Sequence, residues 1–168
     1  LLTGTTNNPW NLKMTPGGSS GGAGSALGAG LGPLAIGSDG GGSCRKPANF
    51  CGIVGMKPSQ GRVANYPPSH WWPLSTAGPM ARSVRDLALL LDIISGSDAR
   101  DPHAEPSSHS HFDSIENGID GANIGFSLTL GGSVPRQEIS EIVSKCMGYF
   151  AKGGADVHGA VPDYENPM

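Results

Sequence analysis

The sequence predicts an α/β layered fold, in which short strands alternate with helices. Two short apolar runs of strand length, residues 34–36 and 53–56, are bounded by glycine or proline. A strand, a helix and a second strand are expected in that order between residues 123 and 160. Alternation of this kind is typical of helices packed on the faces of a sheet.

Composition narrows the classes of function. Net charge is −3 and only 15% of the 168 residues are charged, so there is no basic surface for a nucleic acid or an anionic membrane. The longest apolar run, residues 87–91, is far shorter than the ~20 residues of a membrane helix. Three cysteines without metal-ligand spacing favour free thiols in the cytoplasm. The five histidines lack ligand-like partners, so we expect no metal site.

The chain also lacks an initiator methionine and opens without a cap or turn. We therefore expect residues 1–168 to be the middle of a longer chain.

Residues 1–36 are predicted to form a loop, a helix of small residues and a short strand. Pro9 moves Asn8 out of the α region, so residues 1–15 should form a loop that leads into Pro16 and Gly17. Residues 22–32 are nearly all Gly, Ala, Ser or Leu, which predicts a buried helix that packs unusually close to its neighbours. Residues 34–36 should be a buried strand, from whose end a glycine-rich serine loop leaves.

Residues 53–96 are predicted to form a strand, two irregular segments and a helix. Residues 53–56 should form another short buried strand, and residues 60–63 a turn into an extended piece. Residues 66–74 should form a proline-stiffened aromatic loop. Ser83 and Asp86 form a capping box, so a helix should begin there. Its apolar face should consist of Leu87, Leu90, Leu91 and Ile94, and the helix should end at Gly96.

The last third contains one long polar stretch and one strand–helix–strand pattern. Residues 97–121 should be a surface excursion. Residues 123–128 alternate toward a strand, a helix begins after Pro135, and residues 155–160 should form a weaker strand. The helix should end at Gly153 and Gly154, with an apolar face of Ile139, Ile142, Val143, Cys146 and Phe150.

Two serines, Ser19 and Ser43, lie within glycine clusters. Gly40, Gly41 and Gly42 let the backbone turn tightly just before Ser43, because glycine alone reaches positive φ without steric cost. Several amides aimed at one point suit a developing oxyanion. Taken singly, serines in glycine loops would be ordinary turn residues.

Four ordered blocks of sequence carry a resemblance to a known family. They are PGGSSGG at residues 16–22, GSDGGGSCRKP at 37–47, FCGIVGMKP at 50–58 and GPMARS at 78–83. In these blocks the chain resembles the amidase signature family of Ser-Ser-Lys amide hydrolases. The resemblance implies an α/β/α sandwich around a mixed β-sheet, of which residues 1–168 would be the central part.

The resemblance also implies roles residue by residue. Ser43 would be the nucleophile and Ser19 the serine that relays its proton, with the Gly18–Ser19 peptide bond in the cis form. The amides of Gly40, Gly41, Gly42 and Ser43 would form the oxyanion hole. No metal or organic cofactor is implied.

The third catalytic member of the family is a lysine that must be neutral to act as a base. In the family it lies well upstream of the relay serine, which here places it before Leu1. Lys13 could replace it, but an isolated loop lysine is usually solvated. Lys46 and Lys57 occupy motif positions that are not the family's base.

Other interpretations of the site are open from the residues alone. Residues 17–21 also fit G-x-S-x-G, with Ser19 as an α/β-hydrolase nucleophile, although that motif needs a strand running directly into it. Cys44 is a rival nucleophile, but a buried thiol normally acts as a small apolar side chain. Asp39 and Arg45 should brace the nucleophile loop.

Four aromatic residues of the 66–74 loop could line an acyl pocket or pack beneath the loop. The substrate-binding candidates are Trp71 and Trp72, with Tyr66 and His70 beside them.

The predicted function is hydrolysis of a small-molecule carboxylic amide through an acyl-Ser43 intermediate. A glutamine-hydrolysing subunit of a tRNA-dependent amidotransferase is the alternative within the family. A catalytically silent fragment that only binds or packs is the alternative outside it. Whether copies of the chain form a homo-oligomer stays open.

Overall fold

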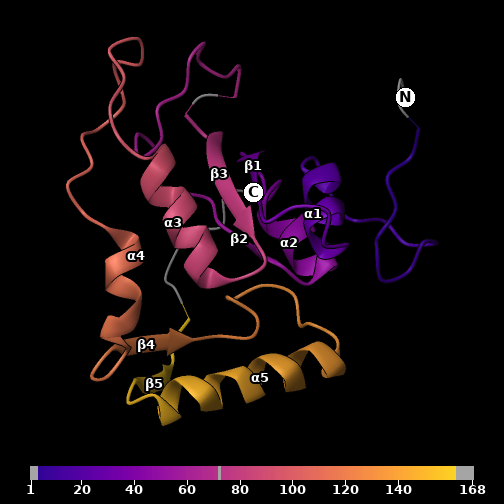
Figure 1. Ribbon diagram of the computed structural model, residues 1–168. Helices are drawn as coiled ribbons and strands as arrows, with labels where there is room; N and C mark the ends of the chain where they lie inside the picture. The colour runs from indigo at the N-terminus through magenta and orange to yellow at the C-terminus, as the bar shows by residue number, and fades with distance from the viewer. Residues whose placement is uncertain (1–3, 72, 162–168) are drawn as a thin grey trace. The chain divides into compact units, whose positions relative to one another are not determined.

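The computed structural model describes residues 4–71 and 73–161, and the chain divides into two compact units between Ile115 and Glu116. The first unit contains three strands and the helices α1 to α4 (Figure 1). The second contains a parallel strand pair and one long helix. Every predicted site residue that the structure describes belongs to the first unit.

Helix α1 (Gly21–Gly28) confirms the small-residue helix, but it ends earlier than expected and buries only one face. That face packs on α2 (Arg45–Cys51), a helix that sequence reasoning missed. A Cβ atom added at Gly24 would lie 2.8 Å from the Cβ of Pro47. The small residues therefore do serve close helix packing, between α1 and α2.

The three-stranded sheet of the first unit is antiparallel, with the order β1-β3-β2. Strands β1 (Leu34–Asp39) and β2 (Val54–Gly55) confirm two predicted strands. The expectation that both are buried is wrong for the described residues, since Val54 is only half-buried and Ile36 is 56% exposed. A small core of Leu27, Cys44 and Met80 lies between this sheet and the helices.

Strand β3 (Thr76–Ala81) is the central strand and was not predicted, because Gly78 and Pro79 argue against a central strand. The structure accommodates both residues. The Pro79 carbonyl accepts a hydrogen bond from the Met56 amide at 3.1 Å. A Cβ at Gly78 would collide with the Met56 carbonyl oxygen, so the close strand approach requires glycine.

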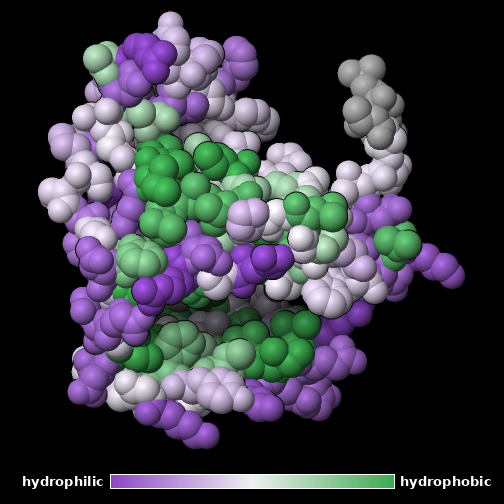
Figure 2. Space-filling view, viewed as in Figure 1, coloured by the Kyte–Doolittle hydropathy of each residue, from purple (hydrophilic) through white to green (hydrophobic). Residues whose placement is uncertain are grey.

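Helix α3 (Val84–Ile94) begins as predicted, with the Asp86 amide donating to the Ser83 hydroxyl at 3.1 Å. Its buried residues are Leu87, Ala88, Leu90 and Leu91. Leu89 and Ile93 lie on the opposite, exposed side, and Figure 2 shows hydrophobic residues gathered over α3. No helix within residues 4–71 and 73–161 is long and apolar enough to cross a membrane.

The polar stretch 97–121 runs mostly without regular structure, as expected, but it contains α4 (His111–Ser114) and the short 3-10 helix η1 (Ile115–Asn117). One carboxylate on α3 holds the start of α4. Asp92 accepts hydrogen bonds from the Ser110 hydroxyl and from the amides of His111 and Phe112 at 2.8–3.0 Å. Burial by itself would raise the pKa of Asp92, but these bonds and one to the His111 ring outweigh it and hold that pKa well below its usual range.

The second unit is a β-α-β arrangement. Strands β4 (Asn123–Phe126) and β5 (Asp156–Gly159) pair in parallel and flank α5 (Gln137–Lys152). All three elements confirm the prediction. No described residue of α5 is buried, and Ile142 on its apolar face is 60% exposed.

Candidate active site

One cavity of the first unit, of about 530 Å³, brings together the two serines of the glycine clusters. Its lining consists of hydroxyls, two glycines, one indole and one cation: Ser19, Ser38, Gly40, Gly41, Ser43, Lys46, Ser69, Trp71 and Ser75. Four of the predicted site residues and the substrate-binding candidate Trp71 are therefore in one place.

The relay candidate Ser19 lies in the loop before α1, directly after a cis Gly18–Ser19 peptide bond. The nucleophile candidate Ser43 lies in the loop that leaves β1. The residue after Ser19, Ser20, joins these loops. Its amide donates to the Ser43 carbonyl at 3.2 Å, and its hydroxyl accepts from the Ser38 amide at 3.3 Å.

The nucleophile loop is braced by Asp39, whose side chain is fully buried. Its carboxylate accepts from the Gly42 amide at 2.6 Å and the Cys44 amide at 3.1 Å. Arg45 binds both carboxylate oxygens, at 3.0 Å each. These bonds, with that from Arg45 foremost, hold the pKa of Asp39 well below its usual range. The predicted brace is confirmed.

The three glycines predicted as oxyanion donors differ in position. Gly40 and Gly41 line the cavity. The Gly42 amide instead donates to Asp39, and Gly42 has a φ of +102° that favours glycine. An amide already bonded to a buried carboxylate is a poor donor for a substrate oxygen, and the oxyanion role of these glycines stays a prediction.

Cys44 is fully buried in the core. Burial, with a contribution from the negative charge of Asp39, raises the pKa of its thiol to about 11. Because the thiolate is the nucleophilic form, Cys44 is unsuited to attack a substrate.

None of the three lysines near the motif blocks is placed as the base. Lys46 lines the cavity, whereas Lys13 and Lys57 do not. The Lys46 side chain is exposed. None of the described lysines is placed as a buried partner of Ser19.

The aromatic loop contributes Trp71 to the lining of the cavity. Trp71 lines it while remaining largely exposed. Trp72 lies outside the described residues. The Arg100 guanidinium carbon instead lies over the Tyr66 ring, 5.3 Å from the ring centre. The peptide bond between Tyr66 and Pro67 is cis. His70 does not line the cavity.

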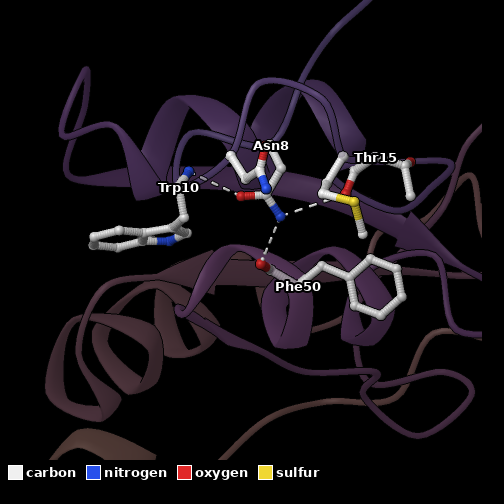
Figure 3. A pocket seen from close by; sticks show the side chains of 6 residues that line it. Asn8, Trp10, Thr15 and Phe50 are labelled. Carbon is white, nitrogen blue, oxygen red and sulfur yellow. Dashed lines mark hydrogen bonds between the residues drawn. The ribbon is translucent and has the colours of Figure 1, made fainter.

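A second, smaller pocket of about 280 Å³ lies beside the loop that leads to Pro16 and is mostly apolar. Figure 3 shows the Asn8 side chain between Thr15 and Phe50. Its amide donates to the Phe50 carbonyl at 2.8 Å, and its oxygen accepts from the Trp10 amide at 2.9 Å. Asn8 thus ties this loop to α2, a structural role that the sequence did not reveal.

Among residues 4–71 and 73–161, no group of three or more His, Cys, Asp or Glu side chains could hold a metal ion. The residues that the sequence did not predict at the cavity are Ser38, Lys46, Ser69 and Ser75. Ser38 and Lys46 both lie in the motif block 37–47, but their spacing alone did not indicate a position at the site.

Comparison with known proteins finds relatives whose names include acylamidase and amidotransferase subunit. The family model "Amidase" matches residues 1–167. An acylamidase of Rhodococcus erythropolis is 39% identical over 168 residues, covering 99% of this chain and 35% of that protein. A glutamyl-tRNA(Gln) amidotransferase subunit of Rubrobacter xylanophilus is 47% identical over 124 residues, covering 73% of this chain and 26% of that protein.

Solved structures show the same relationship. A bacterial aryl acylamidase superposes with a TM-score of 0.87 at 38% identity, covering 94% of this chain and 33% of that one. The corresponding amidotransferase subunit of Thermotoga maritima superposes with a TM-score of 0.84 at 34% identity, covering 94% of this chain and 35% of that one. The chain thus spans about a third or less of the relatives described, and it shares their fold. The chain belongs to the amidase signature family.

Proposed function

We propose that the protein containing this chain is an amidase, which hydrolyses a carboxylic amide to a carboxylate and ammonia or an amine. The observation that carries the proposal is one cavity lined by both Ser19 and Ser43 together with Gly40 and Gly41. A nucleophile, a proton relay and oxyanion donors are the groups that acyl transfer from an amide requires. The chain would form the central part of one amidase domain.

In the proposed reaction the Ser43 oxygen attacks the amide carbon, and its proton passes to Ser19 and onward to a base. The carbonyl oxygen becomes an anion that the amides of Gly40, Gly41 and Ser43 stabilise. Collapse of this intermediate breaks the C–N bond, and the amine leaves with a proton. Water then attacks the acyl-Ser43 ester, which releases the carboxylate and restores the Ser43 hydroxyl. We propose that the base is a lysine outside the 168 residues, because no described lysine is both buried and at the cavity.

A narrower candidate is a glutamine-hydrolysing amidotransferase subunit. It is favoured by the 47% identity to the Rubrobacter xylanophilus protein, whose name states an amidotransferase activity. Such a protein would act with partner subunits. Three free cysteines support a cytoplasmic location for either enzyme.

The test uses the full-length protein that contains this chain. Ammonia release from simple amides, with an acyl adduct on Ser43 detected by mass spectrometry after acid quench, is expected for an amidase. Release from glutamine alone would favour the amidotransferase subunit. No release from any amide, with no adduct, would contradict the proposal.

A further inference from the structure

Lys46 contributes the one charged side chain among the described residues that line the cavity. The other lining groups are serine hydroxyls, glycines and Trp71, and none of them is acidic. A substrate entering this cavity therefore meets a positive charge with no described acidic group beside it.

The position of Lys46 follows from the loop that carries Ser43. Lys46 is in the first turn of α2, and its amide donates to the Gly42 carbonyl at 2.8 Å. Its aliphatic stem runs over Gly42, because a Cβ there would lie 3.0 Å from the lysine Cε and 3.2 Å from its Cγ. The stem is packed against the nucleophile loop, while the side chain as a whole remains exposed at the cavity.

No acidic side chain of the described residues forms an ion pair with Lys46. The nearest candidate in sequence, Asp39, is buried and bound by Arg45 through both oxygens. Its charge is thus neutralised within the loop. The ammonium of Lys46 remains available for an anion from outside the chain.

We propose that Lys46 is a specificity-determining residue that binds a carboxylate carried by the amide substrate, so that the enzyme prefers anionic amides. The inference rests on the proposed function, since it concerns the substrate of the same cavity. An ammonium on a flexible stem provides three hydrogen-bond donors and can follow carboxylates at somewhat different distances from the scissile bond. The expected order of substrates is anionic, then neutral, then cationic.

The experiment compares three amides of matched length in the full-length protein: glutaramate, valeramide and 5-aminovaleramide. Wild type should have a kcat/KM for glutaramate about tenfold or more above that for valeramide, the lower end for a hydrogen bond to a charged group. Lys46→Gln should bring the ratio of the two kcat/KM values close to one, whether kcat/KM for valeramide itself rises or falls. Lys46→Arg should retain the ratio, because it keeps the charge.

Lys13→Gln is the matched control, because Lys13 is an exposed lysine of the same unit that does not line the cavity. It should leave the ratio unchanged. An equal loss in Lys13→Gln and Lys46→Gln would indicate a general effect of net charge and would overturn the role of Lys46. So would a wild-type ratio near one.

A binding measurement separates this inference from the proposed function. In a Ser43→Ala background, calorimetry should show tighter binding of glutaramate than valeramide, with the difference lost on adding Lys46→Gln. If wild type hydrolyses none of the three amides, the amidase proposal fails for them, and the binding difference still decides the role of Lys46. Equal binding of the two amides would overturn it.

Discussion

The Ser20 amide donates a hydrogen bond to the Ser43 carbonyl oxygen at 3.2 Å. This bond links the loop before α1 to the loop after β1, so Ser19 and Ser43 are positioned by adjacent backbone segments. The Ser20 hydroxyl extends the link to the Ser38 amide on β1. The two serine loops therefore behave as one unit that depends on the space around Ser20.

Gly37→Ala should disturb this unit. A Cβ at Gly37 would lie 2.6 Å from the Ser20 Oγ and 2.8 Å from the Cys44 Sγ, so one of them must move. We expect a loss of about 1–3 kcal/mol in the free energy of unfolding, as for overpacking, with a fall in kcat. Gly32→Ala is the control, because a Cβ there meets nothing within 4 Å. Equal behaviour of the two variants in urea unfolding and in kinetics would contradict the argument.

Ser43→Ala in the full-length protein should lower turnover by about 10⁶-fold, the scale for a lost serine nucleophile. Ser19→Ala should lower it by about 10²–10⁴-fold, the scale for lost proton transfer. Both should keep the wild-type circular dichroism spectrum, because these side chains line the cavity rather than the core. Ser97→Ala, at an exposed serine away from the cavity, should be unaffected. Turnover retained in Ser43→Ala would mean that the nucleophile is another residue.

Asp39→Asn should destabilise the first unit by on the order of 3–5 kcal/mol, because Arg45 and the loop amides lose a buried anionic acceptor. The effect should depend on pH. The pKa of Asp39 is lowered on folding, so its stabilisation is fully present above the unfolded pKa of ~4 and is lost as pH falls through the folded value. The difference in unfolding free energy between wild type and variant should therefore be constant near neutral pH and shrink in acid.

Asp98→Asn serves as the matched control for that experiment, since Asp98 pairs with Arg100 at the surface. Its unfolding should resemble that of wild type at neutral pH. A difference for Asp39→Asn that stays constant down to strongly acidic pH would rule out the carboxylate as its source.

Two glycines of α1 should respond in opposite directions to alanine. Gly24→Ala places a Cβ 2.8 Å from that of Pro47 and should cost about 1–3 kcal/mol of unfolding free energy. Gly22→Ala meets nothing within 4 Å and should stabilise by about 0.5–1 kcal/mol, because alanine loses less backbone entropy in a helix. Thermal unfolding of the two variants measures the contrast. Stabilisation in both would show that α1 and α2 are less closely packed than described.

Much of the fold was predictable because its signals are local. The capping box at Ser83 and the apolar spacing of α3 required only neighbouring residues, as did the start of α5 after Pro135. Strand β3 was missed because Gly78 and Pro79 oppose a central strand locally, and only pairing with β1 and β2 on both sides makes it one. Helix α2 was missed because its RKPANFC sequence contains proline and little helical periodicity.

The candidate site likewise has a part that could be predicted from the sequence and a part that only the tertiary structure shows. The roles of Ser19 and Ser43 were predicted through the resemblance of four motif blocks to a known family, and the brace of Asp39 and Arg45 from their positions beside Ser43. By itself the sequence determined the chemical groups and the local turns that present them. Only the tertiary structure decided which of these groups share a cavity, that the Gly42 amide serves Asp39, and that Lys46 lies beside the serines. Those relationships depend on packing between segments distant in sequence, which no local pattern encodes.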